Sequence, residues 1–117
     1  MWKPFRRRPS VRRAFFSALW DGIRLTWPIL SGLIVLKVCL GIIIGMVEGW
    51  GRTEGIYFAF ITGLTIGYGD LAPVRGIARV LAASIGFTGI LLTGVIAALV
   101  VRALQIAAPF DPLAPRR

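Results

Sequence analysis

The sequence predicts an all-α membrane protein with two membrane-spanning helices and, between them, a short helix that enters and leaves the membrane on the same side. Three observations support this fold class. Hydrophobic residues make up 56% of the 117 residues and the mean hydropathy is +0.77, both too high for a soluble domain of this size. Residues 25–47 and 77–101 form apolar segments long enough to cross a bilayer. Residues 54–64 form a third apolar segment, which is too short to cross one.

Residues 1–24 are basic and precede the first apolar segment. Ser10 can cap a helix that begins at Val11, after which apolar side chains recur every three to four residues to the end of this segment. This pattern is typical of an amphipathic helix that lies along the membrane interface. Arg12 and Arg13 near its start are the candidate contacts to anionic lipid headgroups. A solvated basic leader that only sets the membrane topology is the alternative.

Charge and composition exclude several classes of function. The formal net charge is +9, but residues 48–79 carry three acidic and three basic side chains, so the excess lies towards the two ends. Because positively charged loops stay in the cytoplasm, we expect cytoplasmic termini and no nucleic acid partner. Histidine is absent and Cys39 is the single cysteine, which argues against a zinc site, a disulfide framework and an enzyme.

The first predicted span carries one charged residue. Pro28 suits the first turn of a helix, and Trp27 and Trp50 bracket the span where interfacial aromatic residues are expected. Lys37 lies well inside the span, where a charge is costly unless it snorkels, pairs or faces water. We expect Lys37 to snorkel towards the cytoplasmic headgroups. Contact with the polar side of a neighbouring helix, or a direct role in a pore, is the alternative.

Residues 65–70 read Thr-Ile-Gly-Tyr-Gly-Asp and follow the short apolar segment. In an extended strand successive carbonyls point to opposite sides, so a chain that aims consecutive carbonyls at one axis needs alternate residues in a left-handed conformation. Gly67 and Gly69 stand at alternate positions, and glycine adopts this conformation without a Cβ penalty. The stretch therefore predicts a row of backbone oxygens, with the side chains of Ile66 and Tyr68 turned outward.

This stretch resembles the selectivity filter of potassium channels, whose backbone carbonyls replace the hydration shell of a dehydrated K+ ion. The wider pattern, from about residue 25 to residue 101, is similar to the pore module of potassium channels with two transmembrane helices. The resemblance implies K+ ions in the filter, no organic cofactor and an acidic ring of Asp70 at the outer mouth. Since one strand cannot surround an ion, it also implies a homotetramer. The ion-binding residues it implies are Thr65, Ile66, Gly67, Tyr68 and Gly69.

The same resemblance assigns roles on the second span, where small residues recur every three or four positions along one stripe. Gly89 lies at the position of a gating hinge, and Gly94 is a second flexible point. Thr93, Ala97 and Val101 are the candidates for the inner cavity and its constriction. Close packing of helices is the alternative explanation of such a stripe.

The short segment before the filter would be the pore helix. Thr53 can cap it, and Glu54 in its first turn complements the positive end of the helix dipole. Tyr57, Phe58 and Phe60 would form an aromatic cuff around the filter, or would simply pack between helices.

The resemblance divides the chain into a basic N-terminal segment (1–24), a pore domain (25–101) and a short cytoplasmic tail (102–117). The pore domain would comprise a first span (25–47), a pore helix (54–64), a filter (65–70) and a second span (77–101). The N-terminal helix is similar in pattern to the slide helix of inward-rectifier-type channels. A bacterial plasma membrane is the location this predicts.

Two residues depart from simple bacterial two-helix potassium channels. Those channels have a tryptophan where this chain has Phe58 and an acidic residue where it has Ile61, and both join a hydrogen-bond network with the acid that corresponds to Asp70. Neither Phe58 nor Ile61 can form a hydrogen bond through its side chain. We therefore predict filter inactivation that differs from that of those channels.

A weakly selective cation channel and a non-conducting membrane subunit or adaptor are the alternative functions.

Overall fold

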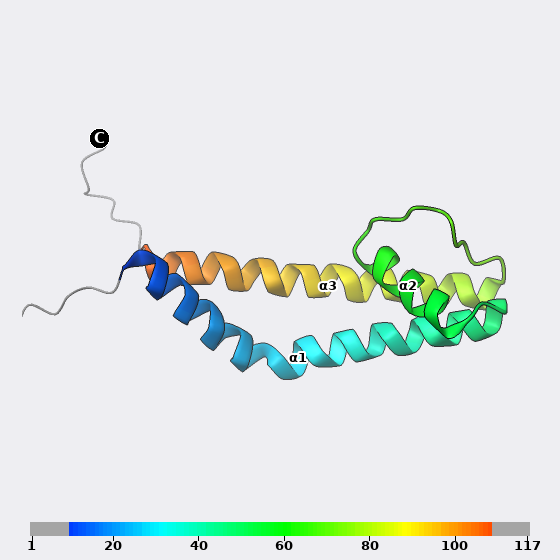
Figure 1. Cartoon of the computed structure of the whole chain (residues 1–117), viewed down its shortest axis with the longest axis horizontal. Helices are drawn as coiled ribbons and strands as arrows, with labels where there is room; N and C mark the ends of the chain where they lie inside the picture. The colour runs from blue at the N-terminus through cyan, green and yellow to red at the C-terminus, as the bar shows by residue number, and fades with distance from the viewer. Residues whose placement is uncertain (1–9, 109–117) are drawn as a thin grey trace, which may run out of the picture. The chain divides into compact units, whose positions relative to one another are not determined.

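The computed structural model describes residues 10–108, which form three helices and contain no β-strand within that range (Figure 1). They are α1 (Val11–Glu48), α2 (Arg52–Gly63) and α3 (Gly76–Ala107). The predicted all-α class is confirmed. α1 and α3 are long and apolar enough to cross a membrane, and α2 between them is shorter. The outer parts of the predicted N-terminal segment and tail, residues 1–9 and 109–117, lie outside the described residues.

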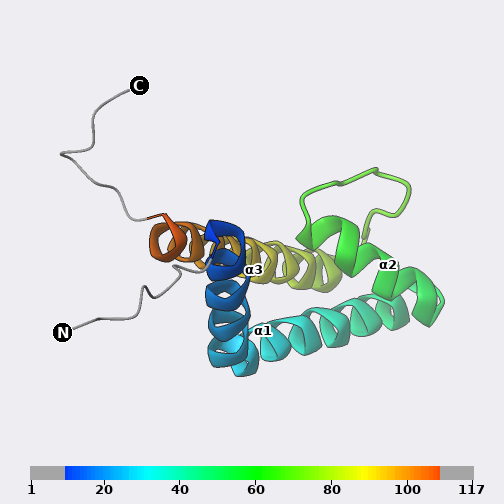
Figure 2. The same ribbon diagram turned by 60° about the vertical axis from the view of Figure 1, so that its left-hand side comes forward.

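The described residues divide into two compact units, one of residues 10–26 with 97–108 and the other of residues 27–96. In the first unit Gly22 on α1 faces Leu99 on α3, and a Cβ added to Gly22 would lie 2.9 Å from the Leu99 side chain. In the second unit α2 lies beside the later part of α1 and the early part of α3, as both views show (Figures 1 and 2). The second unit also holds the glycine-rich stretch.

α1 is continuous where the sequence predicts two separate helices. We expected an interfacial helix to end before residue 25 and Pro28 to lie in a first helical turn, and both expectations are wrong, because Pro28 lies inside α1. Proline removes one backbone donor, a loss that membrane helices tolerate. The Thr26 hydroxyl donates to the Gly22 carbonyl at 2.9 Å, and the Ser31 hydroxyl donates to the Pro28 carbonyl at 3.2 Å. Both bonds are local, each joining residues about one turn of the helix apart.

α2 begins earlier than predicted. Its N-cap is Gly51, which has extended backbone angles (φ −70°, ψ 163°) and makes no side-chain cap bond, so Thr53 is not the cap. Glu54 lies in the first turn, as predicted. Its carboxylate folds back against Gly51, where an added Cβ would collide with Oε2. The negative charge at this end complements the helix dipole without a capping hydroxyl.

α3 continues beyond the predicted end of the second span, to Ala107. The first proline of the tail is Pro109, and a residue before proline is driven out of the helical conformation. The helix therefore extends into the predicted tail and ends just before the proline.

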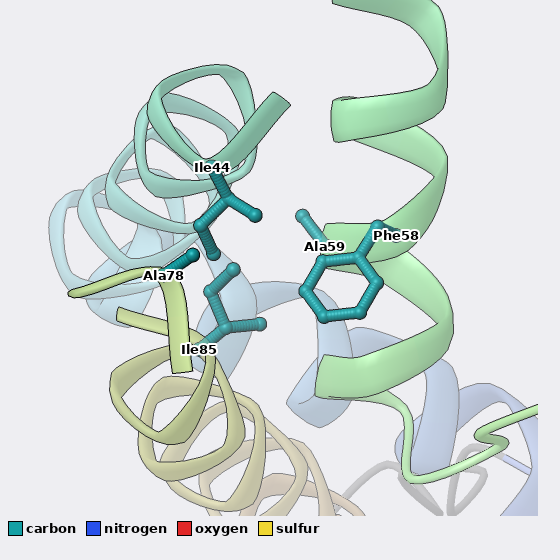
Figure 3. Close-up of a cluster of buried hydrophobic side chains, with 5 residues drawn as sticks. All are labelled: Ile44, Phe58, Ala59, Ala78 and Ile85. Atoms are coloured by element: carbon teal, nitrogen blue, oxygen red, sulfur yellow. The ribbon is translucent and has the colours of Figure 1, made fainter. Parts of the chain in front are cut away.

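A buried apolar cluster joins all three helices of the second unit (Figure 3). Trp50 packs edge to face on Phe58, with ring centroids 5.4 Å apart and an interplanar angle of 61°. Phe58 therefore packs between helices, which is the alternative to its predicted place in an aromatic cuff. The cluster consists of Ile44, Phe58, Ala59, Ala78 and Ile85.

Candidate functional site

The backbone after α2 alternates in handedness. φ is 59° at Thr65, 57° at Gly67 and 80° at Gly69. In the described part of the chain Thr65 is the one residue other than glycine with positive φ, so Ile66 and Tyr68 have negative φ. The predicted left-handed conformation of the two glycines is confirmed. Thr65 extends the alternation by one position, although a side chain in this conformation costs about 1–3 kcal/mol.

Residues 65–70 form a single strand that belongs to no β-sheet, and the backbone amides at its start bond to the end of α2. The N–H groups of Ile66 and Gly67 both donate to the Ile61 carbonyl, at 2.8 and 3.2 Å, and the Thr65 N–H donates to the Thr62 carbonyl at 3.0 Å. These bonds satisfy carbonyls that the last turn of a helix leaves without intrahelical partners.

The same bonds fix the direction of the carbonyls. No peptide bond in residues 10–108 is cis, and a trans peptide holds its N–H and C=O on opposite sides. Because the amides of Ile66 and Gly67 point at α2, the carbonyl oxygens of Thr65 and Ile66 point away from it. Two consecutive oxygens therefore share one side of the strand, which is the arrangement that the glycine spacing predicts.

Asp70 ends the strand and is bonded to α2. The Tyr57 hydroxyl donates to Asp70 Oδ2 at 2.9 Å. This hydrogen bond raises the pKa of Tyr57, so the phenol stays protonated and remains the donor at neutral pH. Neither Phe58 nor Ile61, the two positions that depart from bacterial two-helix channels, supplies this bond. The difference in inactivation stays a prediction, with Tyr57 as the partner of the acid.

Glu48, the last residue of α1, holds the chain after it leaves the strand. Its Oε1 accepts hydrogen bonds from the Val74 and Arg75 amides, at 3.1 and 2.8 Å. The Arg79 guanidinium donates to the Pro73 carbonyl at 3.1 Å in the same loop. The two amides that Glu48 binds are 26 and 27 residues away along the chain. No local pattern indicates such a contact.

α2 contacts both flanking helices through glycines. Gly55 lies against Gly41 and Gly45 of α1, so close that a Cβ on Gly55 would collide with the Gly41 carbonyl. At the other end of α2, a Cβ on Gly89 of α3 would collide with the carbonyl of Gly63. Backbones approach this closely only where side chains are absent. The glycines thus set the position of α2, and with it the start of the strand.

The predicted hinge and cavity residues differ in their surroundings. Gly89 is buried and serves the contact with Gly63, which matches the helix-packing alternative. Gly94 is exposed and has no group within 4 Å of the place where a Cβ would stand. Thr93 is also exposed. Ala97 and Val101, which belong to the first unit, are exposed as well.

Lys37 does not snorkel, so that prediction is wrong. Its side chain is 1% exposed, and Nζ lies 5.3 Å from the centre of the Phe60 ring. A Cβ added to Gly63 would lie 2.6 Å from Nζ, so the end of the lysine lies against the bare backbone of that glycine. An aromatic face and the negative end of a helix both attract a cation. This attraction explains why the Lys37 side chain does not extend to the lipid headgroups. Lys37 does contact a neighbouring helix, as in the alternative, but through an aromatic ring and a glycine rather than through polar side chains.

Arg12 and Arg13, the predicted lipid contacts, lie in the first turn of α1 and are both exposed. With Ser10 and Phe16 they line a shallow depression of the first unit. Their guanidinium groups are therefore accessible to an external partner.

We predict that Gly89→Ala lowers the thermal stability of the purified protein in detergent. The new methyl group would overlap the Gly63 carbonyl, and overpacking of this kind costs about 1–3 kcal/mol. Gly94→Ala is the matched control on the same helix, because its methyl group meets open space and alanine favours the helix. Equal unfolding temperatures for the two variants would contradict the packing role of Gly89.

We predict that Glu48→Ala loosens the loop after the strand. The Val74 and Arg75 amides lose their acceptor, so their hydrogen exchange should speed up by roughly tenfold, the factor for about 1.4 kcal/mol. Mass spectrometry of peptides covering this loop measures the rate. Glu54→Ala, which removes a carboxylate at the start of α2, is the control and should leave the rate unchanged. Unaltered exchange in Glu48→Ala would show that the bonds do not hold the loop.

Comparison with known proteins identifies the family. Residues 32–106, well over half of the chain, match a protein family described as "Ion channel". Human potassium channel subfamily K member 17 is 48% identical over 42 residues, which are 36% of this chain and 13% of that protein. Human potassium channel subfamily K member 16 is 36% identical over 69 residues, covering 59% of this chain and 20% of that protein.

A plant relative gives the same result. Two-pore potassium channel 1 of Arabidopsis thaliana is 34% identical over 74 residues, covering 53% of this chain and 20% of that protein. The chain thus spans a fifth or less of the length of these relatives. No solved structure matches the chain significantly. The chain belongs to the ion channel family, which is not a family of enzymes, and its resemblance to the pore module of potassium channels is confirmed.

Proposed function

We propose that the protein is a potassium-selective channel, which conducts K+ passively across the membrane through a tetrameric pore. The observation that carries this proposal is the alternating backbone from Thr65 to Gly69, with consecutive carbonyls directed away from α2. Four such strands around an axis would form stacked rings of oxygens that replace the water around K+. The carbonyls of all five residues would hold the ions, and the Thr65 hydroxyl would complete the innermost ring. No organic cofactor takes part.

The proposed homotetramer is supported by the single copy of the strand in this sequence, because one strand cannot surround an ion. The exposed side chains support it. Tyr68 is 70% exposed and Ile66 is 47% exposed in the single chain, although both belong to a stretch that the resemblance places at the centre of a pore. Large exposed apolar side chains at one place are typical of an interface. We infer that neighbouring copies cover Ile66 and Tyr68 and hold the filter at its working diameter.

Electrostatics favours cations at both ends of the strand. The C-terminal end of α2 is the negative end of its dipole, and it directly precedes Thr65. Asp70 from four chains would form an acidic ring that concentrates cations at the outer mouth. Tyr57 would keep that carboxylate in place through its hydrogen bond.

For the gate, we propose Gly94 as the flexible point of the second span. Gly89 keeps its place as a hinge candidate by resemblance, but its contact with Gly63 already requires a glycine there. Thr93, Ala97 and Val101 remain the proposed lining of the inner cavity and constriction. An apolar ring at this level would close by dewetting.

We further propose a bacterial plasma membrane location with both termini in the cytoplasm. The pore domain would occupy residues 25–101, with the basic segment 1–24 before it and the tail 102–117 after it. Arg12 and Arg13 would contact anionic headgroups at the cytoplasmic surface, where each basic residue contributes about 1 kcal/mol of attraction.

A flux assay tests the main proposal. Purified protein in liposomes should pass K+ and exclude Na+. Gly67→Ala should abolish selective flux, because alanine at φ 57° costs about 1–2 kcal/mol in each strand. Gly32→Ala is the control, since Gly32 on α1 has nothing within 4 Å of an added Cβ. Equal passage of Na+ and K+ would favour the weakly selective channel, and absence of flux from a monomer or heteromer would favour the non-conducting subunit.

The lipid contact has its own test. We expect greater K+ flux in liposomes with anionic lipid than in neutral ones, and we expect the double variant Arg12→Gln, Arg13→Gln to lose this difference. Arg52→Gln, at the start of α2, is the control and should keep it. If the double variant responds to anionic lipid as the wild type does, the basic start of α1 is not a lipid contact.

A further inference from the structure

Lys37 is a buried cation at the end of the pore helix. It reaches from α1 to the last turn of α2, where its ammonium lies over the Phe60 ring and against Gly63. Phe60 and Gly63 are three positions apart on one face of α2, and Gly63 is its last residue. The position of the lysine requires glycine at position 63, because any side chain there would occupy the space of the lysine.

The location gives the charge an electrostatic effect. A cation at the C-terminal end of a helix neutralises part of the negative dipole there. In this chain that end directly precedes Thr65, the first residue of the proposed filter. The negative end of the pore helix is also the feature that would attract a cation to the inner mouth. The positive charge of Lys37 therefore weakens the electrostatic attraction that the C-terminal end of α2 exerts on K+.

Packing alone does not require a charge at this site. Methionine has a similar length, contacts aromatic rings favourably and carries no cost of burying a cation among apolar helices. The lysine is 1% exposed. A charge kept at such a position is by default a functional feature.

From these observations we infer that Lys37 is a positioning residue that sets the affinity of the inner end of the filter for K+, by neutralising part of the α2 dipole. This inference rests on the proposed channel function. It predicts that loss of the charge increases occupancy of the inner sites and lowers the K+ concentration that half-saturates the flux. One charge at a helix end changes an equilibrium constant by about two- to fivefold, which is the shift we expect.

The experiment measures K+ flux against K+ concentration in liposomes for the wild type and for Lys37→Met, Lys37→Gln and Lys37→Arg. Both neutral variants should half-saturate at a lower K+ concentration, by about two- to fivefold, and Lys37→Arg should match the wild type. A merely structural role would change the stability or the amount of tetramer. It would not give a half-saturating K+ concentration that differs between the neutral and the charged variants.

Several results would overturn the inference. One is a wild-type half-saturating concentration in the neutral variants, and another is an equal shift in Lys37→Arg. If neither neutral variant assembles while Lys37→Arg does, the charge serves folding rather than ion affinity. Absence of flux from the wild type would overturn the proposed function, and this inference with it, whereas normal wild-type flux with no shift overturns this inference alone.

Discussion

The structure depends on the close approach of three backbones at glycine. α2 lies between two long helices, and at each of its ends it meets a neighbour without an intervening side chain: Gly55 against Gly41 and Gly45, and Gly63 against Gly89. Helices in a membrane gain little from burying apolar surface against one another, because lipid is equally apolar, so tight packing has to hold them together. The apolar cluster of all three helices adds to this contact. Together they fix the end of α2 from which the strand begins.

The strand takes its geometry from that fixed end. Its first amides bond to carbonyls of the last turn of α2, and the planarity of the trans peptide then directs the opposite carbonyls away from the helix. The other end is held separately, through Asp70 by Tyr57 and through the following loop by Glu48. A row of oxygens held at both ends needs little rearrangement to receive an ion. Such preorganisation favours binding, because few groups have to be ordered when the ligand arrives.

The sequence predicts the parts that depend on local chemistry. Segment lengths predict the order of two long helices around a short one, and the spacing of Gly67 and Gly69 predicts their left-handed backbone. Three of the misses depend on contacts between distant residues. The bonds of Glu48 and Tyr57 require partners from the loop after α2, and the burial of Lys37 requires a partner from another helix. Pro28 was misplaced because proline is tolerated inside a long membrane helix as well as in a first helical turn.

The central claim is that four copies of this strand surround dehydrated K+ ions. The most direct test is a density map of the purified protein in K+, determined by electron cryomicroscopy. The account predicts a fourfold assembly with a column of ion densities on the axis, level with the carbonyls from Thr65 to Gly69, and loss of that column when K+ is replaced by Na+. A map without fourfold symmetry, or a fourfold map whose axis holds no ions between these carbonyls, would contradict it.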